Sequence, residues 1–197
     1  MTSFSRFVVR LSLAIARVER VALMALLGWL LLLVMLNVVT RYARMPLYWV
    51  DEAAVYSVVW LTFVGASVMT RLRMDFAVTQ VTDKLGELNA RRVRVLATVL
   101  VLAFGLALLA MCWVWMDPVG IARAGFDAKE YAANSFNFVY TERTQTLNWP
   151  TWVLQLVMPL FAATFSVHAL ANLVEELGLQ PREPLPGFPK ATADAVN

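Results

Sequence analysis

The segment VALMALLGWLLLLVMLNVVT, residues 21–40, decides the fold of this chain. It contains no Asp, Glu, Lys or Arg, and a helix needs about 20 apolar residues to cross a bilayer. Backbone polar groups cannot stay unpaired in lipid, so such a segment spans a membrane as a helix. Three more uncharged runs follow at residues 53–70, 95–116 and 151–174. The sequence therefore predicts an all-α integral membrane protein with four transmembrane helices.

The composition leaves room for one four-helix membrane domain over residues 21–177, because the whole chain has 197 residues and 60% of them are hydrophobic. The single cysteine, Cys112, excludes an internal disulfide, and a single histidine argues against haem held by paired imidazoles. We find no Ser/His/Asp set, glycine-rich phosphate loop or metal-ligand cluster in the sequence. We therefore expect no enzyme, no cofactor and no metal site.

The distribution of basic residues predicts the orientation of the chain. Twelve Lys and Arg lie in the N-terminal segment, the second connection and the tail, and five lie in the first and third connections. The positive-inside rule then places both termini in the cytoplasm. Basic residues at span ends orient helices, so we expect no nucleic-acid partner. The first span is interpreted as a retained anchor rather than a cleaved signal peptide, because residues 36–40 make a poor cleavage site.

Residues 1–20 have the pattern of an amphipathic helix. An apolar stripe at helical spacing lies roughly opposite four arginines: Arg6, Arg10, Arg17 and Arg20. This pattern predicts an interfacial helix on the cytoplasmic leaflet, with its arginines near anionic headgroups. Packing of the same helix on a partner protein is the alternative. At the other end of the chain, residues 178–197 form a Pro-rich tail that we expect to be extended or disordered.

Aromatic residues gather at the predicted outer ends of the spans, where amphipathic rings favour the headgroup layer. They are Tyr42, Tyr48, Trp49, Trp113, Trp115, Trp149 and Trp152. The outer loop, residues 117–150, is the one long outer connection. Pro118 should end the third span, and residues 122–139 have the composition of one or two short helices. Sequence reasoning leaves open whether this loop only packs or also docks a soluble partner.

The second span and the residues before it carry the densest signal in the chain. The candidate contact residues are Arg41, Trp49, Asp51, Glu52, Trp60 and Gly65. On a helix, one face is large and aromatic and is headed by Glu52, whereas the face with Gly65 is small enough for close helix packing. Asp51 and Glu52 have two readings. In the first, they cap the helix or pair with an arginine of the first connection of the same chain. In the second, one of them pairs with a basic residue of another subunit.

Two residues of the fourth span also stand out. Pro159 predicts a kink, because proline cannot donate the helical hydrogen bond. His168 lies toward the predicted cytoplasmic end of the span. We interpret it as a hydrogen-bonded or interfacial histidine, and a proton relay is the alternative.

Several of these motifs resemble the small permease subunit of TRAP transporters, the tripartite ATP-independent periplasmic transporters. The resemblance rests on Arg41-Tyr42, Trp49-x-Asp51-Glu52, Trp60, Gly65-Ala66 and the sequence LNWPTW at residues 147–152. It covers roughly residues 15–177. The chain departs from the family pattern after the second span, where Met74-Asp75 stands in place of a His, and in the length of its outer loop.

The resemblance implies a non-catalytic scaffold subunit in the bacterial inner membrane. Its partners would be membrane lipids, a large multi-span permease subunit and, transiently, a periplasmic substrate-binding protein. The system would take up organic acids or similar anions with sodium. Two alternatives remain. A small homo-oligomeric carrier or channel would need a membrane-embedded carboxylate or polar pore stripe, and a redox anchor would need cofactor ligands.

Overall fold

The chain is described by a computed structural model over residues 3–73 and 86–182, and these residues are all-α apart from loops and one isolated β-bridge. Five helices build the body of the molecule. They are α1 (Ser3–Tyr42), α2 (Tyr48–Leu72), α4 (Glu87–Met116), α7 (Thr151–Gln155) and α8 (Val157–Glu176). By length and composition, four helical stretches could cross a membrane, and each contains one of the predicted spans.

The helices extend beyond the uncharged runs from which the spans were predicted. Helix α2 continues through Arg71 to Leu72, and α8 continues to Glu176. A charge therefore marks the edge of the apolar segment without ending the helix, because arginine and glutamate are good helix formers. Consequently, several charged residues that the sequence places in connections belong to helices.

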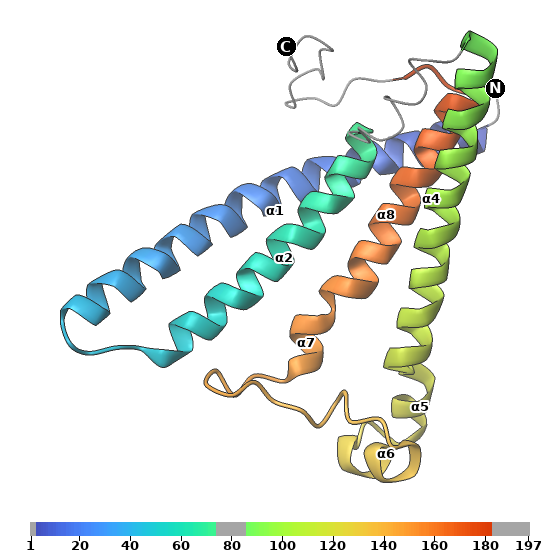
Figure 1. The fold of residues 1–197 in the computed structure, drawn as a ribbon. Helices are drawn as coiled ribbons and strands as arrows, with labels where there is room; N and C mark the ends of the chain where they lie inside the picture. The colour runs from blue at the N-terminus through green and yellow to red at the C-terminus, as the bar shows by residue number, and fades with distance from the viewer. Residues whose placement is uncertain (1–2, 74–85, 183–197) are drawn as a thin grey trace.

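Figure 1 shows how the long helices are arranged. Helices α1 and α2 form an antiparallel hairpin, and α8 lies between α2 and α4. The N-terminal part of α1 crosses the end of α8. Helix α8 is therefore the central element, because it packs against α1, α2 and α4.

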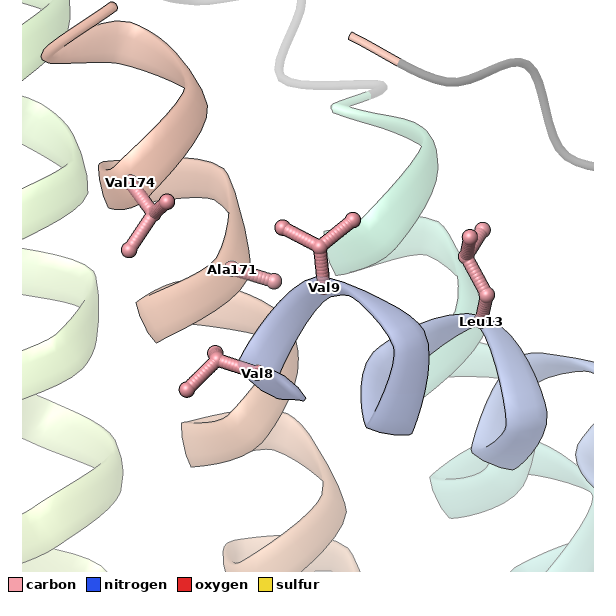
Figure 2. Packing of buried hydrophobic residues seen from close by; sticks show 5 residues of the cluster. All are labelled: Val8, Val9, Leu13, Ala171 and Val174. Atoms are coloured by element: carbon pink, nitrogen blue, oxygen red, sulfur yellow. The ribbon is translucent and has the colours of Figure 1, made fainter. Parts of the chain in front are cut away.

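The expected N-terminal interfacial helix is not a separate element, since α1 runs unbroken from Ser3 to Tyr42. Its 40 residues correspond to about 60 Å, twice the thickness of a bilayer core. Figure 2 shows a hydrophobic cluster that joins its first turns to α8. The cluster consists of Val8, Val9, Leu13, Ala171 and Val174. The N-terminal segment thus packs on the bundle through one face, while Arg6, Arg10 and Arg17 are exposed on another and Arg20 is half-buried.

The fourth span is broken into α7 and α8 at Leu156. Pro159 explains the break, because a proline at this position cannot donate to the carbonyl of Gln155, four residues earlier. The irregularity that the sequence predicts at Pro159 is therefore present, one turn ahead of the proline itself.

The outer loop holds two short helices, α5 (Pro118–Arg123) and α6 (Ala128–Ser135). Helix α4 ends at Met116, and Asp117 then adopts a left-handed conformation and caps α5 through the N–H of Gly120. The prediction of short helices in this loop is confirmed, although α5 begins before residue 122. Most of the predicted Pro-rich tail, residues 183–197, lies outside the described residues, as do Met74 and Asp75.

Candidate functional site

Arg41 and Asp51 join the ends of α1 and α2. The Nη2 of Arg41 lies 2.9 Å from Oδ2 of Asp51, and both side chains are about half exposed or more, at 63% and 49%. Asn37 completes the group, because it donates to Asp51 and accepts from Nε of Arg41. Asp51 thus pairs with an arginine of its own chain. The exposure limits the contribution of this pair to about 1 kcal/mol or less.

Glu52 has a different role from its neighbour. Its carboxylate accepts the backbone N–H groups of Gln145, Thr146 and Leu147 at 2.9, 2.8 and 2.9 Å, and it also accepts the Thr146 hydroxyl. No arginine pairs with Glu52 among the described residues. Three successive amides converging on one carboxylate hold the outer loop against the start of α2, since charge-assisted hydrogen bonds are the strong ones.

Trp60 ties the middle of α2 to the broken fourth span. Its indole N–H donates to the carbonyl of Leu154 at 3.0 Å, and that carbonyl lies in α7, just before the break. A tryptophan in an apolar region needs a partner for its N–H. The break at Leu156 and the Trp60 contact therefore lie next to each other at the same depth of the bundle.

Gly65 is not a position of close helix approach. A Cβ at Gly65 would meet only Leu23 at 3.9 Å, whereas a Cβ at Gly105 would lie 2.6 Å from Ser166 Oγ and 2.7 Å from Phe165 Cδ1. The tight crossing is therefore between α4 and α8. Sequence reasoning missed Gly105 because it sits in an ordinary apolar run with no polar neighbour to mark it.

The predicted aromatic belt lies at the end of the bundle formed by the α1–α2 turn, the end of α4 and the start of α7 (Figure 1). Five of its seven members are exposed, and Trp115 and Trp152 are half-buried. The ring of Trp152 lies tilted against that of Tyr140 in the outer loop, with ring centroids 5.9 Å apart. The belt thus leaves most of its rings free for contact with surroundings, while Trp152 anchors the loop.

The outer loop is held in place by its own polar contacts. Tyr140 donates to the carbonyl of Met116 at 2.6 Å, and Tyr131 donates to Asp117 at 3.1 Å. Partial burial, with Tyr131 and Asp117 nearby, raises the pKa of Tyr140. Asp127 caps α6, and the N–H groups of Glu130 and Lys129 lower the pKa of its carboxyl. The loop is therefore an ordered cap over the ends of α4 and α7.

A buried ion-pair network closes the opposite end of the bundle. Arg71 makes a two-pronged contact with Glu175, at 2.6 and 3.0 Å, and its side chain and that of Glu175 are 2% and 1% exposed. Arg71 also donates to Asn172. Arg73 extends the network to Glu175 and Glu176. From the sequence, Arg71 and Arg73 are only two of the basic residues of the second connection that predict the orientation. Nothing in the sequence pairs them with residues about a hundred positions later.

His168 is fully buried between α1 and α8. Its Nδ1 lies 2.7 Å from Ser12 Oγ and its Nε2 lies 2.9 Å from Glu19, which is 7% exposed. With Nε2 donating to the carboxylate, Nδ1 of a neutral imidazole accepts the Ser12 hydroxyl proton. The hydrogen-bonded histidine expected from the sequence is present, but sequence reasoning missed both partners, which lie about 150 residues away.

Ser12, His168 and Glu19 resemble a catalytic nucleophile with its base in residue types only. Ser12 and His168 are both 0% exposed, and a nucleophile must reach a substrate. No group of three or more metal-binding side chains occurs within residues 3–73 and 86–182. The three side chains instead provide hydrogen-bond partners for one another where α1 crosses α8.

A family model for the DctQ component of the tripartite ATP-independent periplasmic transporters matches residues 30–178 of the chain. The match covers about three quarters of the 197 residues. It contains every predicted contact residue from Arg41 to Gly65, but it excludes Ser12 and Glu19. A search of curated proteins found no match.

Proposed function

Because the chain belongs to the DctQ family of TRAP transporter components, we propose that it anchors and enlarges the scaffold of a large permease subunit. The family is non-catalytic, so substrate chemistry resides elsewhere in the system. The proposed system takes up organic acids or similar anions together with sodium, and a periplasmic binding protein delivers the solute. The observation that carries the proposal is the family match over residues 30–178.

The distribution of buried charge supports a static scaffold. The ion pairs of Arg71 and Glu175 and the His168 group all lie toward one end of the bundle and are formed within the chain. A carrier usually keeps an ionisable residue at membrane depth that faces a cavity or pathway. The outer carboxylate Glu52 is likewise occupied by the chain's own loop. These side chains stabilise a fixed arrangement of helices.

We propose that the large permease subunit packs on the exposed face of α1 and α2. Only 6% of the most apolar part of α1 is buried, compared with 28% for the fourth span. A shallow apolar groove of about 410 Å³ runs along this face. Its lining is Ala22, Ala25, Leu26, Trp29, Trp60 and Val64. Small residues such as these two alanines let a neighbouring helix approach closely in lipid.

Copurification tests this proposal. Ala25→Trp fills the groove without adding charge, and we expect it to lower recovery of the large subunit with the tagged chain by about tenfold, since overpacking costs about 1–3 kcal/mol. Leu100→Trp is the matched control, because Leu100 is 61% exposed on α4, away from the groove. Equal recovery from both variants contradicts the proposed face. Recovery of only self-associated wild-type chains contradicts the scaffold role and favours a small homo-oligomeric carrier.

A further inference from the structure

A cleft of about 510 Å³ opens at the end of the bundle where α2 and α8 finish and α4 begins. Its walls come from three helices and the segment after α8. They are Thr70 within α2, Arg73 just after it, four residues of α4, four of α8, and Arg182. This volume lies within the range of ligand sites, about 300–1,000 Å³. Helices α2 and α4 both pack on α8 (Figure 1), so the cleft has α8 as one wall.

The outer part of the cleft carries an excess of positive charge. Three of its lining residues are arginines, Arg73, Arg94 and Arg182, and two are carboxylates, Glu175 and Glu176. Both oxygens of Glu175 are already engaged by Arg71 and Arg73, and Glu176 pairs with Arg73. The carboxylates therefore neutralise Arg71 and Arg73, which leaves little negative charge in the cleft to repel an anion.

Arg94 is less committed to partners than Arg73, which pairs with both Glu175 and Glu176. Within the described part of the chain its contact is with Glu176 alone, at 3.6 Å, and its side chain is 43% exposed. The pKa of Arg73 is lowered, mainly by burial. The negative charges of Glu176 and Glu175 act to raise the pKa of Arg73, and the positive charges of Arg182 and Arg71 act to lower it. The last effect reports that positive charges crowd at this end of the bundle. A guanidinium fork held loosely beside other cations matches the geometry of a phosphate group.

The inner part of the cleft is apolar. Ala97 and Val101 of α4 face Ala169 of α8, at successively deeper positions along the helices. Thr70 and Thr98 lie between the charged and apolar parts, and their hydroxyl protons are donated to their own helices. Polarity therefore falls from the end of the bundle toward its middle, in the same direction as in a phospholipid.

We propose that this cleft binds an anionic phospholipid. The phosphodiester lies between Arg94 and Arg182, and the first carbons of an acyl chain follow Ala97, Val101 and Ala169. Basic pockets between membrane helices on the cytoplasmic side are suited to anionic headgroups, and the predicted orientation places the cleft there. The inference goes beyond the scaffold role and does not depend on which face binds the large subunit.

Native mass spectrometry of the full-length chain, extracted in a mild detergent, tests the proposal. We expect the wild-type chain to retain added phosphatidylglycerol in preference to zwitterionic phosphatidylethanolamine. Arg94→Gln should lower the apparent affinity for phosphatidylglycerol about tenfold, because it removes a charge-assisted contact. Arg92→Gln is the matched control, since Arg92 is an exposed arginine two positions away that does not line the cleft. Equal loss, or no loss, in both variants overturns the proposal.

A second pair of measurements separates a lipid from free phosphate. Ala97→Leu keeps every charge and fills the apolar part, so it should also weaken phosphatidylglycerol binding. Inorganic phosphate added alone at the same concentration should not displace the lipid. If inorganic phosphate displaces phosphatidylglycerol completely, or if Ala97→Leu binds the lipid as the wild type does, the acyl chain contributes nothing and a lipid site is excluded.

Discussion

Arg71 and Arg41 are both arginines near the end of a membrane helix, yet they differ in their surroundings. Arg71 and Glu175 are almost fully buried, with exposed fractions of 2% and 1%, whereas Arg41 and Asp51 are exposed by 63% and 49%. Breaking a buried pair leaves a charge without a partner or water, but breaking an exposed pair lets water replace the partner. Breaking the Arg71–Glu175 pair should therefore lower the stability of the fold more than breaking the Arg41–Asp51 pair.

Arg71→Met should lower the free energy of unfolding of the purified chain by about 3 kcal/mol. Thermal unfolding in detergent measures this change. Arg41→Gln serves as the control, and its loss should stay below about 1 kcal/mol. The double variant Arg71→Met/Glu175→Met should recover most of the loss, because neither partner then remains as a buried charge. Losses of equal size in Arg71→Met and Arg41→Gln would contradict this account.

Glu52 shows how one carboxylate can organise a loop far away in the sequence. It accepts three consecutive backbone N–H groups, from residues 145–147, and thereby orients the chain just before α7. A β-bridge between Arg143 and Pro150 closes the same turn. Asp51, one residue earlier, points to Arg41 instead. Adjacent residues on a helix point about 100° apart, which is why the two carboxylates serve different partners.

At the scale of the helices, the α4–α8 crossing depends on a glycine. The backbone of α4 at Gly105 lies so close to α8 that an added Cβ would contact Ser166 and Phe165 below normal van der Waals distance. Phe165 also contacts Phe104 edge-on and Phe161 at a tilt, with ring centroids 6.0 and 5.2 Å apart. A larger side chain at Gly105 therefore requires Ser166, Phe165 or the helix that carries them to shift.

Gly105→Ala should destabilise the chain by about 1–3 kcal/mol, the usual effect of overpacking a core. The measurement is the midpoint of thermal unfolding in a fixed detergent. Gly28→Ala and Gly65→Ala are the controls, because an added Cβ meets nothing within 4 Å at Gly28 and only Leu23 at 3.9 Å at Gly65. Both controls should be neutral or slightly stabilising, since alanine favours a helix over glycine. A stable Gly105→Ala variant would show that the crossing can relax.

For the whole molecule, the distribution of polar contacts distinguishes the two ends of the bundle. One end carries the aromatic belt and the ordered loop with α5 and α6, and the other carries the buried network of Arg71, Glu175 and Arg73. The positive-inside rule predicts that the second end lies in the cytoplasm. We therefore expect the aromatic end to be periplasmic, on the side from which the proposed binding protein would approach.

Cysteine labelling in whole cells tests this orientation. In a Cys112→Ser background, Asn134→Cys on α6 should react with a membrane-impermeant thiol reagent added outside, once the outer membrane is permeabilised. Ser3→Cys at the start of α1 should react only after the inner membrane is opened. Both positions are exposed, so accessibility and not burial decides the result. Labelling of Ser3→Cys first would reverse the predicted topology.

Local physics explains which features the sequence predicts. Four uncharged runs, the break caused by Pro159 and the short helices of the outer loop follow from rules that act within about 20 residues. The family resemblance likewise rests on short motifs between Arg41 and Trp152. These features need no knowledge of which helix lies beside which, and for that reason the sequence alone was sufficient to predict them.

Only the tertiary structure decided the partners. Ser12, Glu19 and His168 meet because the first turns of α1 cross the end of α8, and Arg71 meets Glu175 because α2 packs beside α8. The same packing brings Gly105, and not Gly65, close to a neighbouring helix. Each contact depends on the rotation and depth of whole helices. Those quantities are set by the sum of many weak packing contacts, and no single residue type reports them.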